Sequence, residues 1–152
     1  TDLFQASISK LAVLAVLQTI VAGIGGNSGN QTLTMIARAI ALGQVGTEHF
    51  NRLVKKEMAV ALINGLIFGG AIGLVIGLME GNLALGLVLT LAMTLNLLLA
   101  SVMGVVIPMW RYRRGQDPAA GSSVLLTAVT DTGGFFIFLG LATVILLRGT
   151  GA

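Results

Sequence analysis

The sequence predicts an all-α integral membrane protein, a bundle of four transmembrane helices that forms a single domain over residues 1–152. Hydrophobic residues make up 55% of the chain and charged residues only 10%, against about 45–50% and about 25% in soluble domains. The apolar residues also gather in four runs, each at least as long as the roughly 20 residues that a helix needs to cross a bilayer. Too few charged side chains remain to cover a soluble surface, so the bilayer is the expected solvent.

The first predicted span covers residues 8–42 and is unusually long. It is apolar from Leu11 to Ile24 and then passes through the sequence GIGGNSGNQ, which ends at Gln31. Four glycines in this stretch predict a break in the helix. Irregular backbone at membrane depth is tolerated only where it is buried in protein or lines a wet cavity, so the stretch is expected beside other helices or a pathway.

The second and third predicted spans, residues 58–79 and 83–107, contain no charged side chain. Glycines recur every fourth residue in the second span, at Gly65, Gly69, Gly73 and Gly77. Such spacing builds a smooth ridge on which a neighbouring helix can pack closely. In both spans, polar residues are expected to form hydrogen bonds between helices: Asn64, Thr90, Thr94 and Asn96. For Asn96, in the middle of the third span, a place beside a pathway is the alternative.

The fourth predicted span, residues 121–147, is interrupted by one carboxylate, Asp131. A charged side chain within a span costs about 2.5–3.5 kcal/mol on insertion scales, and such residues usually face the bundle interior or a water-filled path. Thr127 lies one helical turn earlier, and Gly133 follows closely. We therefore expect an ion or proton pathway at Asp131. The alternative is a structural role, capping a broken helix or pairing with Arg38.

Charges in the connections predict how the chain is oriented. The predicted loops 43–57 and 108–120 contain most of the basic residues: Arg52, Lys55, Lys56, Arg111, Arg113 and Arg114. By the positive-inside rule both loops are cytoplasmic, and both ends of the chain are then external to the cell membrane. Trp110 and Tyr112 are expected at the level of the lipid headgroups. Thr47 and Asp117 are predicted helix N-caps.

The sequence does not predict an enzyme. Its single histidine, His49, lies in a charged loop, there is no cysteine, and the spans contain only one acid. A Ser-His-Asp triad or a pair of carboxylates is therefore excluded within the membrane. The basic residues flank apolar runs instead of forming a stripe with aromatic residues, which argues against nucleic acid as a partner.

Amide side chains near the glycine-rich stretch offer a different chemistry. Asn27, Asn30 and Gln31 carry amide oxygens, and glycines can expose backbone carbonyls. Oxygen atoms are the ligands that Mg²⁺ and Ca²⁺ prefer, and Mg²⁺ keeps several of its waters when bound by one or two carboxylates. Close packing of helices at glycine, with amide hydrogen bonds between them, is the alternative.

Three stretches resemble one known family. The sequence VAGIGGNSGNQTLTMIARAIALGQV, the DPAAG that starts the last span, and the T-x-x-x-D of Thr127 to Asp131 are similar to the membrane domain of the MgtE magnesium transporters and their eukaryotic solute-carrier relatives. The resemblance covers almost the whole chain. It implies a homodimer of five-helix domains whose central cation pore is lined by the second and fifth helices. This chain then looks like a domain that lacks its first helix, and its start at Thr1 agrees with a fragment.

The resemblance also implies roles for individual residues. Asp131 would be the pore carboxylate that holds a largely hydrated Mg²⁺, and its dimer mate would supply the second charge. Thr127 would contribute a hydroxyl or backbone carbonyl, and the facing helix would supply Asn27, Asn30 and Gln31. The missing first helix and a cytoplasmic regulatory domain are implied partners. Two other functions remain open: a proton-coupled transporter of a small solute, and a non-transporting assembly subunit that binds helices through the glycine ridge.

Overall fold

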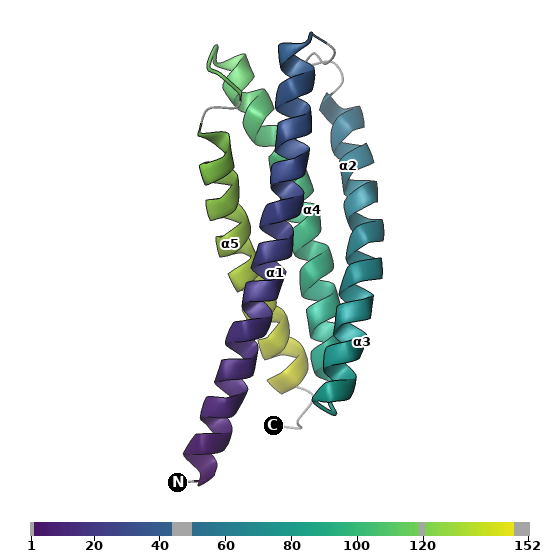
Figure 1. The fold of residues 1–152 in the computed structure, drawn as a ribbon, viewed down its shortest axis with the longest axis vertical. Coiled ribbons are helices and arrows are strands. Elements are labelled where there is room, and N and C mark those ends of the chain that lie inside the picture. Colours follow the sequence, from purple (N-terminus) through teal and green to yellow (C-terminus); the bar gives the residue numbers. More distant parts are fainter. Residues whose placement is uncertain (1, 44–49, 119–120, 148–152) are drawn as a thin grey trace.

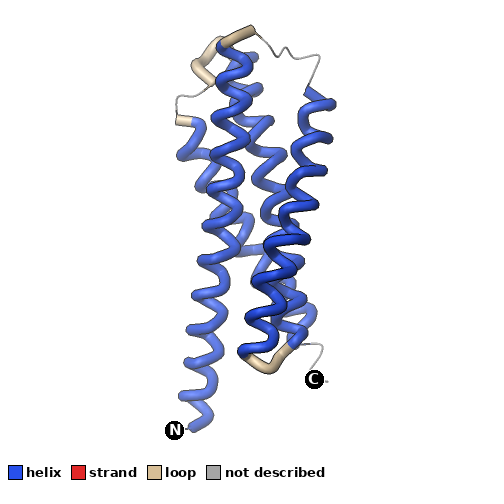
Figure 2. The backbone as a smooth tube through the Cα atoms, turned by 45° about the vertical axis from the view of Figure 1, so that its right-hand side comes forward, coloured by secondary structure: helices blue, strands red, loops and turns tan. Residues whose placement is uncertain are grey.

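A computed structural model describes residues 2–43, 50–118 and 121–147 of the chain. In this part of the chain all regular structure is helical, and four continuous helical rods lie roughly along one another (Figures 1 and 2). The first rod is α1. The second contains α2, a π-helical segment η2, and α3; the third is α4, and the fourth contains α5 and the π-helical η3. Their bounds are Asp2–Ala41, Phe50–Asn64, Gly65–Gly69, Gly70–Met79, Leu83–Arg113, Ser122–Leu141 and Ala142–Leu147.

Helix α1 continues without interruption through the glycine-rich stretch, so the predicted glycine break in the span 8–42 is wrong. Glycine costs about 1 kcal/mol relative to alanine inside a helix, but here it permits close contacts. A Cβ atom at Gly29 would lie 3.0 Å from Leu126 of α5 and 3.2 Å from Ala100 of α4. Packing on two helices therefore keeps α1 helical. With 40 residues, α1 is about 60 Å long, and its N-terminal part extends beyond the other helices (Figure 1).

Helices extend into both predicted connections, 43–57 and 108–120. Helix α2 begins at Phe50, and α4 continues through Pro108 to Arg113. Apolar side chains in the first turns of α2 pack inward: Leu53 and Val54 lie against a buried cluster formed by Ile36, Ile40, Val105 and Met109. This packing extends both helices beyond the uncharged runs. His49 and Thr47 lie outside the described residues.

The second rod packs on α4 along its glycines. A Cβ at Gly69 would lie 3.2 Å from the backbone oxygen of Thr90, and the Thr90 hydroxyl donates a hydrogen bond to the Gly69 carbonyl at 3.0 Å. In a straight α-helix, residues four apart drift around the axis by about 40° per step. The wider turn of η2 counteracts this drift, so the ridge from Gly65 to Gly77 stays on α4.

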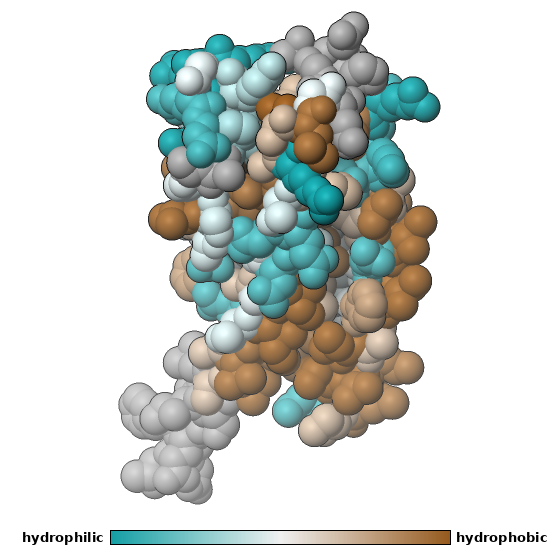
Figure 3. Space-filling view, turned by 45° about the horizontal axis from the view of Figure 1, so that its top comes forward, coloured by the Kyte–Doolittle hydropathy of each residue, from teal (hydrophilic) through white to brown (hydrophobic). Residues whose placement is uncertain are grey.

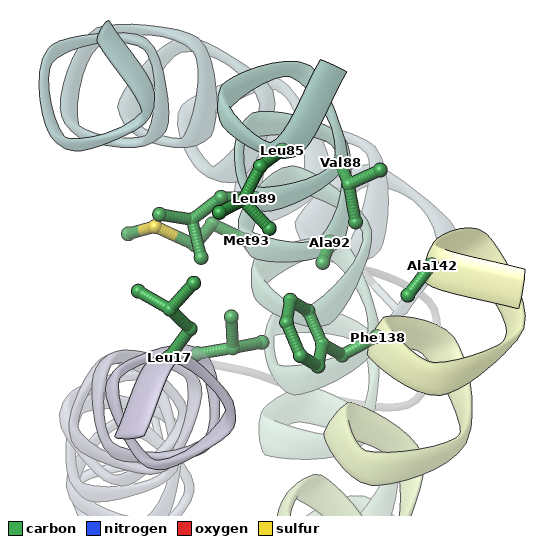
Figure 4. Packing of buried hydrophobic residues seen from close by; sticks show 9 residues of the cluster. Leu17, Leu85, Val88, Leu89, Ala92, Met93, Phe138 and Ala142 are labelled. Atoms are coloured by element: carbon green, nitrogen blue, oxygen red, sulfur yellow. The ribbon is translucent and has the colours of Figure 1, made fainter. Parts of the chain in front are cut away.

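Helix α4 lies at the centre of the bundle and contributes most of the core. The largest buried cluster joins α4 to α1 and to the α5–η3 rod (Figure 4), with Leu17, Val21, Leu85, Val88, Leu89, Ala92, Met93, Phe138 and Ala142 as members. The Asn82 side chain caps the start of α4 by accepting hydrogen bonds from the N–H groups of Ala84 and Leu85. Gly81, with φ +65°, makes the turn before it.

Within the described residues, three helical stretches are long and apolar enough to cross a membrane: Asn51–Met79, Leu83–Arg113 and Ser122–Ile145. A fourth span in α1 stays a prediction. The surface agrees with this arrangement, because hydrophilic residues gather at the upper end of the molecule and hydrophobic residues cover much of its lower side (Figure 3). The upper end is where α1 ends and α2 begins (Figure 1).

Candidate cation site

The predicted amide ligands lie on one face of α1. Asn27 and Gln31 are exposed and Asn30 is half-buried, as expected for residues three or four apart on a helix. The adjacent Gly26 and Gly29 lie on the other side of α1, where they are buried against the neighbouring helices. Because α1 is unbroken, these glycines and the amides lie on opposite sides of the helix. The glycines pack against neighbouring helices, and the amides lie at the surface of the single chain.

Helix α5 likewise has a side that is buried in the bundle and a side that is exposed. Leu126, Thr130 and Gly134 are buried toward the bundle, whereas Asp131 is exposed and Thr127 is half-buried. Among the described residues no ion pair joins Asp131 to Arg38, so the structure gives no support to that alternative. The carboxylate stands on the outer side of an otherwise uncharged helix, one turn before the exposed Phe135.

The two polar faces meet through a hydrogen bond. Ser123 at the start of α5 donates from its hydroxyl to the Asn30 amide oxygen at 2.8 Å. Deeper in the bundle, a Cβ at Gly26 would lie 3.7 Å from the Thr130 hydroxyl oxygen. Because Gly26 precedes Asn27 and Thr130 precedes Asp131, Asn27 lies near the depth of the carboxylate, whereas Asn30 lies beside Ser123, about two helical turns away.

Ser123 is a residue that the sequence interpretation missed. Ser123, Thr127 and Asp131 recur every fourth residue. This spacing places them in one column along α5, and it was readable before the structure. The column presents two hydroxyls and one carboxylate, all of them oxygen groups suited to a hard cation or to its bound water.

Two hollows open toward the end of α1 that lies near the turn between α4 and α5. The first has a volume of about 460 Å³, and the second about 700 Å³; Thr34 and Arg38 border both. The first hollow is also lined by Asn30, Gln31 and Met35. The second is also lined by Leu33, Ala37, Ile40, Ala41, Tyr112, Asp117, Pro118 and Ser123. The polar faces of α1 and α5 thus continue into an open vestibule.

One chain supplies too few strong ligands to strip a divalent cation of its water. The described residues contain no group of three or more His, Cys, Asp or Glu side chains that could hold a metal. At the depth of Asp131, one chain offers this single carboxylate together with the hydroxyl of Thr127 and the amide of Asn27. Such groups accept hydrogen bonds from water, so the arrangement fits a hydrated cation better than a bare one.

Comparison with known proteins points to one family of membrane transporters. The model of the MgtE family, described as a divalent cation transporter, matches residues 18–141. The magnesium transporter MgtE of Enterococcus faecalis is 30% identical over 143 residues, that of Thermus thermophilus 31% over 143, and that of Bacillus subtilis 27% over 140. These alignments cover 94%, 94% and 92% of the chain but 32%, 32% and 31% of the relatives. The chain therefore spans about a third of their length.

Proposed function

The chain belongs to the MgtE family of divalent cation transporters, and on this premise we propose that it forms part of the path by which magnesium crosses the membrane. It is a multi-pass membrane protein and not an enzyme. The relatives named above are magnesium transporters, which supports Mg²⁺ as the transported ion. In this proposal α1 also crosses the membrane, which makes four spans in the chain, the basic connections are cytoplasmic, and both ends of the chain are external.

One observation carries the proposal: Asp131 is exposed on the side of α5. A carboxylate facing lipid would be costly, whereas one facing a water-filled path is not. The α1 amides and the α5 column extend from it along the two helices, with Asn27 near its depth and Asn30 beside Ser123. We infer that this surface faces a second copy of the chain, so that a homodimer encloses a polar path between two α1–α5 faces.

The chemistry of transport follows from this arrangement. Two Asp131 carboxylates brought near one axis would repel each other, and a divalent cation between them relieves that repulsion. Its water molecules would donate hydrogen bonds to the carboxylates and to the oxygens of Thr127 and Asn27. Asn30 and Gln31, about two helical turns away near Ser123, would accept such bonds from a hydrated ion further along the path. Because Mg²⁺ gives up its water reluctantly, outer-sphere contacts of this kind bind it without the cost of dehydration.

The test compares Asp131→Asn with the parent protein and with Glu80→Gln, which neutralises an exposed acid at the turn before α4. Purified protein is reconstituted in liposomes, and Mg²⁺ uptake is followed with an internal fluorescent indicator. We expect Asp131→Asn to lose at least about tenfold in Mg²⁺ uptake, equivalent to about 1.4 kcal/mol of lost interaction, and Glu80→Gln to retain it.

Other outcomes would favour the other functions. Uptake of a solute driven by a pH gradient, without need for Mg²⁺ but dependent on Asp131, would indicate proton coupling. If Asp131→Asn changes no flux while Gly69→Leu breaks association between copies of the chain, an assembly subunit is the better description. Mg²⁺ uptake that is equal in the parent and Asp131→Asn rejects the proposed path.

A further inference from the structure

Asn96 occupies the point where α1, α4 and α5 meet. It lies near the middle of α4 and its side chain is 0% exposed. Both neighbouring helices present a glycine to it. A Cβ at Gly134 of α5 would lie 3.0 Å from the Asn96 amide nitrogen, and a Cβ at Gly25 of α1 would overlap that nitrogen. The amide therefore fills a space that exists only because both facing residues are glycines.

The hydrogen bonds of this amide are incomplete. Its Nδ2 donates to the backbone oxygen of Val21 in α1 at 3.0 Å. Its Oδ1 is buried and has no hydrogen-bond partner among the described residues. A buried carbonyl without a partner is costly, and an apolar side chain would fill the same space without that cost. Asn96 is thus poorly explained by packing alone, and its bond to α1 indicates a positional role.

This junction lies directly behind the candidate cation site. Gly134 follows Asp131 by one helical turn, and Gly25 precedes Asn27 by two residues. The amide is therefore wedged between the two helices that carry the site, near the depth of the carboxylate. The side chain does not reach the exposed face, but it sets how closely α1 and α5 approach each other there.

We propose that Asn96 is a specificity-determining positioning residue, a wedge that fixes the separation of α1 and α5 and thereby the distance from Asp131 to the α1 amides. The inference rests on the proposed function, since it concerns which cation the path accepts. A site that binds an intact water shell selects by the spacing of its oxygens. Mg²⁺ has a compact octahedral shell, whereas Ca²⁺ has longer bonds and a variable number of ligands, so a change in spacing alters their ratio.

Two substitutions should change the separation of α1 and α5 in opposite directions. Asn96→Ala removes the amide and should let α1 and α5 approach, whereas Gly134→Ala adds a Cβ against the amide and should separate them. The double variant brings a complementary pair together, because the new Cβ enters the space that the amide has left. Thr94→Ala is the matched control: Thr94 is also buried on α4 but contacts Gly65 on the second rod.

Two readouts are measured on each variant reconstituted in liposomes. The first is the ratio of Mg²⁺ to Ca²⁺ uptake, with KM and maximal rate determined separately. The second is the distance between spin labels on cysteines introduced at Val16 of α1 and Phe136 of α5, both exposed, which is feasible because the chain has no native cysteine. We expect each single variant to lower the uptake ratio at least about fivefold, the lower end of typical coupling between sites.

We also expect label distances to shift in opposite directions in the single variants, and the double variant to recover part of both readouts. Non-specific damage would not be repaired by a second substitution. If Asn96→Ala and Gly134→Ala match Thr94→Ala in distance and ratio while Mg²⁺ uptake still depends on Asp131, the wedge is refuted and the proposed function stands. If Asn96→Ala does not fold, unchanged readouts in Gly134→Ala refute it equally. If no uptake depends on Asp131, the proposed function fails and this inference fails with it.

Discussion

Gly73 lies at the closest approach of α3 to α4, and replacing it by alanine tests how tightly these helices pack. A Cβ at Gly73 would lie 2.5 Å from the backbone oxygen of Gly86 and would overlap the Thr90 hydroxyl. The backbone oxygen cannot rotate away, so the helices would have to separate. Gly70, three residues earlier, is the matched control, because a Cβ there meets nothing within 4 Å.

The magnitude follows from three contributions. Overpacking a close contact costs about 1–3 kcal/mol. Moving Thr90 also weakens its 3.0 Å hydrogen bond to the Gly69 carbonyl, and hydrogen bonds between membrane helices contribute about 0.6 kcal/mol on average. The gain in helix propensity from glycine to alanine, about 1 kcal/mol, is common to both variants and cancels. The free energy of unfolding of Gly73→Ala should therefore be about 2–4 kcal/mol lower than that of Gly70→Ala.

The assay is unfolding in mixed micelles by increasing fractions of a denaturing detergent, followed by the fluorescence of Trp110, the only tryptophan in the chain. We expect the Gly70→Ala midpoint to lie at or above that of the parent and the Gly73→Ala midpoint well below it. Equal midpoints for the two alanine variants would refute the reasoning, because they would show that the backbones do not approach as closely as described.

Three further predictions use the same unfolding assay. Phe138→Ala should cost about 3 kcal/mol because the ring is 0% exposed and leaves a cavity, whereas Phe136→Ala, at 68% exposed, should stay within about 0.5 kcal/mol of the parent; similar losses would contradict this. Asn82→Ala should cost about 1 kcal/mol through loss of the α4 N-cap, and an unchanged midpoint would argue against the cap. Thr32 and Glu57, both buried, are 3.4 Å apart at their oxygens. A double-mutant cycle with Thr32→Val and Glu57→Gln should give a coupling of about 0.6 kcal/mol, and zero coupling would mean that no hydrogen bond ties α1 to α2.

The fold could be predicted from the sequence where hydrophobicity alone decides the structure. The third predicted span and α4 both begin at Leu83, where a long apolar run starts. The prediction from the sequence was wrong where packing between residues far apart in the chain determines the structure. Glycines in α1 predict a break when read locally, but Gly29 packs on Leu126, which lies almost a hundred residues away, and the helix continues. Helix α2 is a different case, because the N-cap predicted at Thr47 already places a helix start before Phe50, and only the packing of Leu53 and Val54 on other helices lies outside the local sequence.

The candidate site could be predicted in its chemistry but not in its geometry. A carboxylate within an apolar span and a group of amides can be recognised from residue types alone, so Asp131 and Asn30 could be predicted from the sequence. Which side of α1 the amides occupy depended on the helix being unbroken. The contact of Asn30 with Ser123 joins positions far apart in the chain, and no local pattern contains that information. Hydrogen bonding by Asn96 was predicted, but its partner, the Val21 carbonyl, was not.

The π-helical turn at Gly65–Gly69 bears on how the length of this helix can change during evolution. A π-turn holds one more residue than an α-turn, so it accommodates an inserted residue without rotating the helix beyond it. Losing one residue from this segment would restore an α-turn and leave Gly73 and Gly77 still directed at α4. The same deletion within the regular part of α4 would turn all later residues by about 100°. Related chains can therefore differ by one residue in this part of the second rod and keep the same helical hairpin.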